Sequence, residues 1–224
     1  METFAVILLT LLTFIAPVVT VLLVIDKDKK AVIPLLIGGA LFTVVEACII
    51  LPVINYLGYN AFYNIIGIII IEVLRWLVLG AYLKKTGYKI ENVRYFFAGY
   101  SIVNLLVVWG IDALATATVV MFSDFGLLES GEIWISMLLA IIKIIMLYSY
   151  TVFVAAAIRQ KKIWYVFIAM GIHVISDENI IFGLCEALNI NSGMGITVLS
   201  IITCIMLVVN DKMSDLWKGK DDEN

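Results

Sequence analysis

The sequence predicts an all-α protein that crosses a membrane about seven times. Of its 224 residues, 63% are hydrophobic, whereas an ordinary soluble domain is about 45–50% apolar. The apolar residues form long blocks separated by short charged clusters, and a block of roughly 20 apolar residues is long enough for a helix to span a bilayer. We expect a single transmembrane domain over residues 1–210 and a polar cytoplasmic tail over residues 211–224.

Seven apolar blocks are the predicted spans. The first has no basic region ahead of it and no small-residue cleavage site, so we interpret it as a retained helix and not as a removed signal peptide. The sixth block carries several polar residues, and the seventh is shorter than the others. The blocks cover residues 4–25, 32–54, 63–83, 95–121, 133–158, 163–187 and 193–209.

The basic residues support this count, because cytoplasmic loops of membrane proteins carry an excess of Lys and Arg. Basic clusters follow the first, third, fifth and seventh blocks, and they hold thirteen of the fifteen Lys and Arg residues. This alternation predicts a multi-pass protein with its N-terminus outside and its C-terminus in the cytoplasm. We expect it to lie in a plasma membrane of bacterial type. The clusters are Lys27, Lys29 and Lys30; Lys84, Lys85, Lys89 and Arg94; Arg159, Lys161 and Lys162; and Lys212, Lys218 and Lys220.

Ionisable side chains inside the predicted spans are the main functional signal. A charge at mid-membrane costs roughly 2.5–3.5 kcal/mol on insertion scales, so such residues normally face a protein interior. Glu72 and Arg75 are three positions apart and His173 and Asp177 are four apart, so each pair shares a helix face. We expect one polar interior built from five helices, containing Glu46, Glu72, Arg75, Tyr100, Asn104, Asp112, Lys143, His173 and Asp177.

The same residues also allow a purely structural interpretation. A buried Glu–Arg pair neutralises itself, and Lys143 can pair with Glu46 or Asp112. Polar contacts of this kind between membrane helices are common and often worth only about 0.6 kcal/mol. A single histidine such as His173 is more often a hydrogen-bonded interior residue than a catalyst. The pattern alone leaves both interpretations open.

Several functions are excluded by what the chain lacks. One histidine and no HExxH motif argue against a zinc protease. The chain has no Gly-x-Ser-x-Gly, P-loop or GxGxxG motif, and its last block has no lysine to hold a retinal. We predict no cofactor and no metal. The basic cytoplasmic face would attract anionic lipid headgroups and is not a sign of nucleic-acid binding.

Three motifs, in this order, resemble a known family. EVLRW at residues 72–76 precedes a cytoplasmic loop with two lysines, FFAGYSIVN at 96–104 begins the next span, and HVISD at 173–177 lies much later. The arrangement resembles the YhfC-type intramembrane peptidases, relatives of the CAAX-processing and bacteriocin-processing (CPBP) membrane proteases. The resemblance extends weakly over most of the chain, and each motif is short. It implies a polytopic helical fold that handles a membrane-embedded peptide or protein segment.

The resemblance assigns roles to four residues. The family pattern is Glu-Glu-x-x-Arg, Gly-His-Gly-Gly-x-Glu and His-x-x-x-Asp/Asn. Glu72 and Arg75 match the first segment, and His173 and Asp177 match the third. In such a glutamic protease a glutamate activates water, while His and Asp or Asn side chains position that water and stabilise the developing oxyanion.

The chain departs from this pattern at three positions. Ile71 stands where the first of two glutamates is expected, Tyr100 stands in place of the second-segment histidine, and Asn104 stands in place of its glutamate. A tyrosine is a poor general base near neutral pH because its hydroxyl holds its proton tightly. Two or three of the groups expected to carry out proton chemistry are therefore missing.

Three functions remain as hypotheses. The first is a non-catalytic pseudoprotease that binds a membrane peptide or segment without cutting it. The second is an active intramembrane peptidase with a rearranged site made of Glu72, His173 and Asp177. The third is a small-molecule or ion transporter, or a subunit of one, in which intramembrane charges bind a cation or proton and a broken helix provides the passage.

Overall fold

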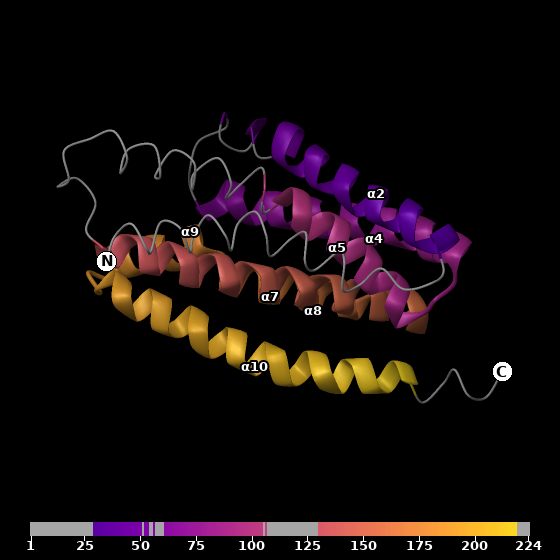
Figure 1. The fold of residues 1–224 in the computed structure, drawn as a ribbon. Coiled ribbons are helices and arrows are strands. Elements are labelled where there is room, and N and C mark those ends of the chain that lie inside the picture. The colour runs from indigo at the N-terminus through magenta and orange to yellow at the C-terminus, as the bar shows by residue number, and fades with distance from the viewer. Residues whose placement is uncertain are drawn as a thin grey trace.

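The computed structural model describes residues 29–50, 52–53, 56, 61–104, 106 and 130–218, and these form an elongated bundle of helices (Figure 1). Within these ranges the structure contains helices and no β-strand. The first predicted span, Asp112 and most of the fourth span lie outside the described residues. The elements are α2 (Lys29–Val45), η1 (Glu46–Ile50), α4 (Ala61–Thr86), α5 (Ile90–Asn104), α7 (Ser130–Gln160), α8 (Trp164–Ser176), α9 (Glu178–Ala187) and α10 (Ser192–Lys218).

Four described stretches are long and apolar enough to cross a membrane. They are Val32–Ile50, Phe62–Thr86, Ile141–Gln160 and Ser192–Met213, which correspond to the second, third, fifth and seventh predicted blocks. The pair α8 and α9 becomes a fifth candidate if the two helices are taken as one bent span. The structure therefore confirms that the described part of the chain is all-helical, with four to five stretches apolar enough to cross a membrane. The seventh block, predicted to be short, belongs to a helix of 27 residues.

The described helices expose many apolar side chains on their outer surface and bury several polar and charged ones within a mainly apolar core. Ile37 on α2 and Ile205 on α10 are 51% and 56% exposed, whereas Glu72 and Arg75 in the centre are fully buried. Lipid tails are as apolar as leucine, so an apolar outer surface suits contact with a bilayer. This surface and the buried charges agree with the expectation that the intramembrane ionisable residues face the protein interior.

The helix ends that carry basic residues lie together at one end of the bundle. In Figure 1 this is the right-hand end, where α2 begins and where α4, α7 and α10 end. The alternation that the sequence predicts is thus present among the described helices. The basic residues at these helix ends are Lys29, Lys30, Lys84, Lys85, Arg159, Lys161, Lys162, Lys212 and Lys218.

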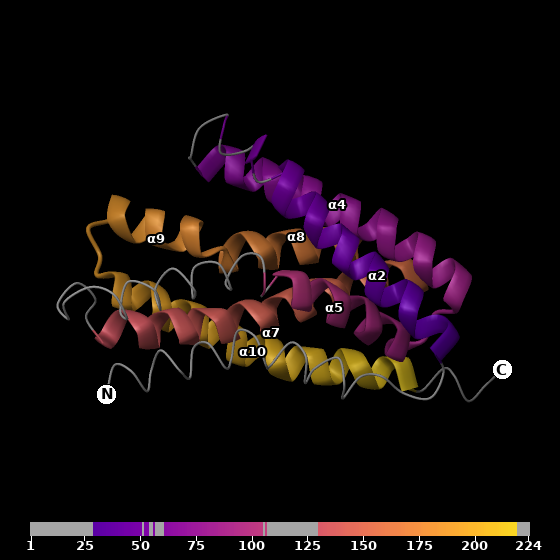
Figure 2. The same ribbon diagram turned by 45° about the horizontal axis from the view of Figure 1, so that its top comes forward.

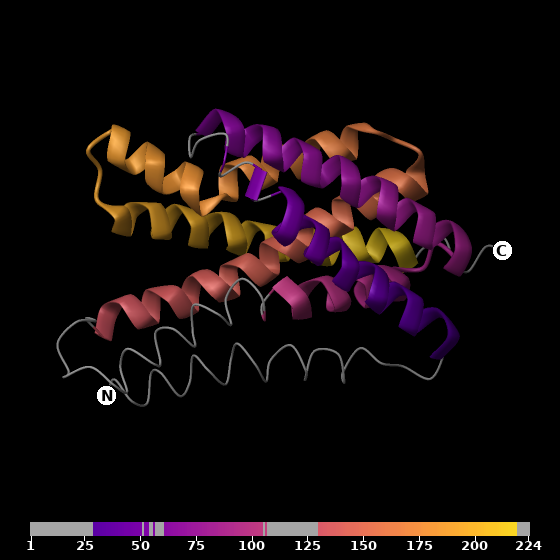
Figure 3. The ribbon, with the colours of Figure 1, turned by 90° about the horizontal axis from the view of Figure 1, so that it is seen from above.

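Two glycines let α2 cross α5 at very short range. A Cβ added at Gly39 would lie 2.0 Å from the carbonyl oxygen of Phe96, and one added at Gly99 would lie 2.0 Å from the carbonyl oxygen of Leu36. Small residues at helix crossings allow such close backbone approach in membranes. Figures 2 and 3 show α2 lying along α4 and α5 on one side of the bundle. This crossing places Tyr100, the next residue on α5, directly beside the end of α2.

A break in the sixth predicted block separates α8 from α9. Asp177 has an extended backbone (φ −71°, ψ 121°), and its carboxylate accepts a hydrogen bond of 3.1 Å from the backbone N–H of Ile180. Asp is a favoured helix N-cap because its side chain satisfies an orphan backbone N–H in this way. The two helices are bent by 50° at this point. The block from 163 to 187 is therefore two helices and not one.

Candidate functional site

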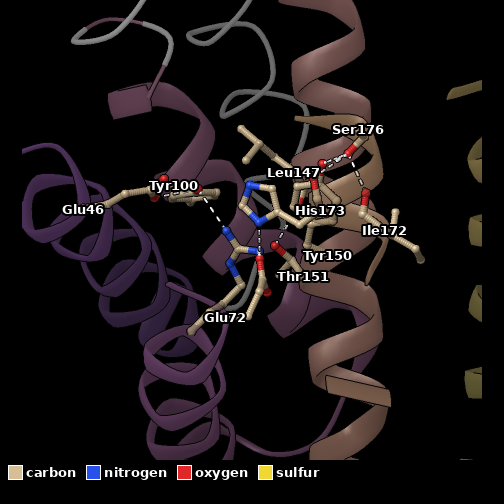
Figure 4. A network of polar contacts seen from close by, with 10 residues as sticks. Glu46, Glu72, Tyr100, Leu147, Tyr150, Thr151, Ile172, His173 and Ser176 are labelled. Atoms are coloured by element: carbon tan, nitrogen blue, oxygen red, sulfur yellow. Dashed lines mark hydrogen bonds and ion pairs between the residues drawn. The ribbon is translucent and has the colours of Figure 1, made fainter. Parts of the chain in front are cut away.

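The centre of the bundle holds a carboxylate that receives two donors on a single oxygen. Glu72 lies in the middle of α4, and its Oε1 accepts a hydrogen bond of 2.6 Å from Arg75 Nη1, one turn further along the same helix. The same oxygen accepts from Nδ1 of His173, on α8, at 2.7 Å (Figure 4). Because the exposed fractions of the Glu72 and Arg75 side chains are zero, these bonds form without competing water.

Arg75 continues the contacts toward α5 and α2. Its Nη2 donates to the hydroxyl of Tyr100 at 3.0 Å, and that hydroxyl donates to Glu46 Oε2 at 2.7 Å. The guanidinium also lies over the rings of Phe42, Tyr100 and Tyr150, with 5.0–5.6 Å between its Cζ and each ring centroid. Cation–π contacts of this kind gain strength when the cation is desolvated. Arg75 is therefore held by charge, hydrogen bonds and aromatic rings together.

His173 is held from a second direction by Tyr150. The two rings stack, with 4.2 Å between centroids and 15° between planes. The Tyr150 hydroxyl shares a hydrogen bond with Ser176 Oγ, and Ser176 Oγ also lies 2.7 Å from the carbonyl oxygen of Ile172, to which it can donate (Figure 4). Stacking and the Glu72 bond together fix the orientation of the imidazole.

These contacts form one continuous series of hydrogen bonds from η1 to α8. It runs from Glu46 through Tyr100, Arg75 and Glu72 to His173. The expectation that these five residues share one interior agrees with this geometry. These bonds connect η1, α4 and α5, which are neighbours in sequence, to the distant α8, so they fix the positions of four elements relative to one another. We call these five residues the polar chain.

Two polar atoms in this interior make no hydrogen bond within the described residues. They are Glu72 Oε2 and Arg75 Nε, and both are buried. Asn104 Oδ1, further along α5, is buried and lacks a partner in the same sense. A buried polar atom without a partner costs roughly 1–3 kcal/mol. The interior is therefore held strongly at some atoms and incompletely satisfied at others.

Asp177 does not take part in the polar chain as the i,i+4 spacing from His173 predicts. That prediction assumed a continuous helix, whereas the helix ends at Ser176 and Asp177 caps the next one. The partner of His173 is Glu72, which lies on a different helix. His173 and Asp177 therefore do not lie on one continuous helix, as the expectation of a shared helix face assumed.

Lys143 and Asn104 also lie apart from the polar chain. Glu46, one of the two acids suggested as partners for Lys143, accepts from Tyr100 instead. Lys143, on α7, lines a small enclosed space together with Ser176 and Glu178, and Glu178 is the acidic group it faces there. The other suggested partner, Asp112, lies outside the described residues.

Sequence reasoning missed Tyr150 and Ser176. Tyr150 is fully buried and touches both His173 and Arg75. Nothing in its local sequence distinguishes it from the other aromatic residues of this chain. Ser176 lies within the HVISD motif, three residues after His173, so its helix face was the one available signal.

The arrangement suits fixed charge compensation better than proton transfer. A general base needs a lone pair that a water or substrate can reach. Glu72 Oε1 is occupied by two donors, and Oε2, which has no partner within the described residues, is buried. Nowhere in the described part of the chain do three His, Cys, Asp or Glu side chains converge as metal ligands would.

Comparisons of the chain with protein-family models, with curated proteins and with solved structures found no match. The resemblance to YhfC-type peptidases stays a prediction from the motifs.

Proposed function

We propose that this protein is a non-catalytic membrane protein of intramembrane-protease type, which binds a membrane peptide or segment without hydrolysing it. The observation that carries the proposal is the double engagement of Glu72 Oε1 by Arg75 and His173 in a fully buried interior. The groups that would activate water in a glutamic protease are here bonded directly to each other.

The position of Tyr100 supports the same proposal. The resemblance expects a histidine there, and the tyrosine hydroxyl is instead committed to Glu46 and Arg75. Its bonds hold η1, α4 and α5 together. The binding half of the proposal rests on the resemblance, because a fold that has lost its catalytic groups can retain the surface that accommodates a membrane segment.

Retention and cleavage can be measured in one experiment. The purified protein in lipid nanodiscs is incubated with a defined pool of single-span membrane peptides, and mass spectrometry records which peptides are retained and whether they stay full length. We expect retained peptides to stay full length with the wild type and with Glu72→Gln. Shortened peptides with the wild type and intact ones with Glu72→Gln would establish a peptidase. Failure to retain any peptide would refute the binding function.

An active peptidase is the second candidate, and the Glu72–His173 contact is the observation that favours it. A carboxylate on Nδ1 fixes the tautomer and orientation of an imidazole, and this is the arrangement that prepares Nε2 as a base in hydrolytic triads. The His173 side chain is only 5% exposed, so substrate would have to reach a nearly closed site. The cleavage arm of the experiment above distinguishes this candidate.

A transporter is the third candidate, and the break between α8 and α9 favours it. Discontinuous membrane helices commonly place ion-binding groups at the break, and here Asp177 and Glu178 stand at the break with Lys143 nearby. Uptake of Na⁺ or protons into protein-containing liposomes tests it. Transport that is lost in Glu178→Gln would establish this function, and wild-type liposomes as tight as empty ones would exclude it for these ions.

The proposal includes seven spans with the basic end in the cytoplasm of a bacterial-type plasma membrane. Tyr88 at the basic end and Ile190 at the opposite end are both exposed and suit single-cysteine labelling in a background without native cysteines. A membrane-impermeant maleimide added to whole cells should label Ile190→Cys and not Tyr88→Cys. The reverse pattern would invert the topology.

A further inference from the structure

A groove opens on the surface of the bundle between α4 and the turn that joins α7 to α8. Its volume is about 400 Å³, and its walls come from Trp76, Leu77 and Gly80 on one side and from Ile158, Lys161 and Ile163 on the other. It is separate from the polar chain, and neither the proposed function nor the motifs make use of it. Its size falls in the range of ligand sites, which is roughly 300–1,000 Å³.

The groove is apolar along its length and opens to the outer surface of the bundle. Leu77 and Ile163 are 53% and 51% exposed, so the groove lies on the part of the molecule that suits lipid contact. Gly80 has no side chain to narrow the groove, and a Cβ added there would come into ordinary contact with a side-chain atom of Ile158, 3.7 Å away. A slender hydrocarbon chain fits such a surface.

The one charged side chain that lines the groove is Lys161, within the described residues. Lys161 is exposed and lies in the α7–α8 turn with a left-handed backbone (φ 54°), and the next N–H, of Lys162, donates to Ala157 O at 3.1 Å. The turn therefore fixes the backbone position from which the Lys161 side chain extends. It lies at the end of the bundle where the basic helix ends gather (Figure 1).

Aromatic side chains mark the same level as an interface. Trp164 begins α8 immediately beyond the groove, is 47% exposed and stacks on Tyr165 with 3.7 Å between ring centroids. Tryptophan and tyrosine concentrate where hydrocarbon meets lipid headgroups. The mouth of the groove thus lies at headgroup depth and its apolar walls extend toward the hydrocarbon.

We propose that this groove binds an anionic phospholipid, with one acyl chain along Leu77 and Gly80 and the phosphate at the Lys161 ammonium. The positive charge at an otherwise apolar site complements a molecule with a negative head and a long apolar tail. This inference is independent of the proposed function, and it differs from the diffuse attraction of a basic face because it names one groove and one lysine.

Native mass spectrometry of the full chain in detergent tests the proposal. The protein is titrated with phosphatidylglycerol and, separately, with phosphatidylcholine of the same acyl chains. We expect one tightly retained phosphatidylglycerol on the wild type. Lys161→Gln should weaken its binding about fivefold, as expected for one lysine near a lipid phosphate, and bring it close to that of phosphatidylcholine.

Two matched controls separate the groove from the general surface. Lys162→Gln changes the adjacent lysine, which does not line the groove, and should leave phosphatidylglycerol binding within twofold of the wild type. Gly80→Leu fills the groove and should weaken both lipids, whereas Gly171→Leu places the same side chain where an added Cβ meets nothing within 4 Å and should weaken neither.

Two outcomes would overturn the proposal. Equal losses in Lys161→Gln and Lys162→Gln would show that the basic surface attracts lipid without a defined site. Unchanged binding in Gly80→Leu, with a monodisperse gel-filtration profile, would show that no acyl chain lies in the groove. If Gly80→Leu does not fold, the comparison of the two lysine variants alone decides the question, because both lysines are exposed in the same turn.

Discussion

The imidazole of His173 donates to Oε1 of Glu72 at 2.7 Å, the same oxygen that accepts from Arg75. This one atom joins α8 to α4 across 101 positions of sequence. Because a buried charge is tolerated only when it is compensated, the contact explains how Glu72 and Arg75 persist in an apolar span. The same contact allows us to predict how the stability of the protein changes when one of these side chains is removed.

Removing Arg75 alone should destabilise the protein strongly. Arg75→Met leaves the Glu72 carboxylate buried without its cation, and breaking a buried pair in this way costs about 3–5 kcal/mol. The measurement is the free energy of unfolding in mixed micelles, followed by helical circular dichroism. The double variant Glu72→Leu/Arg75→Met removes both charges and should recover much of the loss. If the double variant were as unstable as the single one, charge compensation would not be the reason.

The hydroxyl of Tyr100 should contribute to the stability of the protein beyond the contacts of its ring. Tyr100→Phe keeps the ring contacts with Phe42 and Arg75 but removes the group that joins Arg75 to Glu46. We expect a loss of about 1–3 kcal/mol, since two buried charged groups each lose a hydrogen bond. Tyr148→Phe is the control, because the ring of Tyr148 packs on Phe97 and lies outside the polar chain. Equal unfolding free energies for the two variants would contradict the bridging role.

The α2–α5 crossing should not accept a methyl group. Gly99→Ala would place a Cβ 2.0 Å from a backbone carbonyl oxygen of α2, and backbone cannot move aside as a flexible side chain can. We expect a marked fall in melting temperature and in folded yield. Gly183→Ala on α9, where an added Cβ meets nothing within 4 Å, should be neutral or raise stability by about 0.5–1 kcal/mol through helix propensity. A stable, well-folded Gly99→Ala protein would disprove the close crossing.

Asp177 should behave as a helix cap. Asp177→Ala removes the acceptor for the Ile180 N–H and should cost about 0.5–2 kcal/mol, whereas Asp177→Asn keeps an acceptor and should cost much less. Thermal unfolding of the two variants provides the comparison. If Asp177→Asn loses as much stability as Asp177→Ala, the position requires the negative charge and not the capping hydrogen bond.

For the described residues, the sequence predicted the helices except for the break at Asp177, and it predicted one side-chain pair correctly. Glu72 and Arg75 are one turn apart on a helix that both patterns and structure show as continuous, so their pairing follows from helix geometry alone. The cost of placing a charge in lipid also indicated that Glu46 and His173 face inward. The basic clusters at alternate loops predicted the single basic end of the bundle.

The partners across helices could not be predicted in the same way. Periodicity defines which face of a helix a residue occupies, and it does not define which neighbour packs there. The i,i+4 spacing predicted that His173 and Asp177 share a helix face, but an Asp inside an apolar block gives little warning that it will end the helix and cap the next. Tyr150 depends wholly on how α7 packs against α8.

The spacing of Glu72 and Arg75 also affects how the chain enters a membrane. Both charges lie within one turn of α4, so they can neutralise each other as soon as that helix forms, long before His173 is synthesised. Helix α4 therefore does not depend on a distant partner to be tolerated in the bilayer during translation. We therefore expect His173 to add its bond to a pair that is already in place when α8 docks against α4.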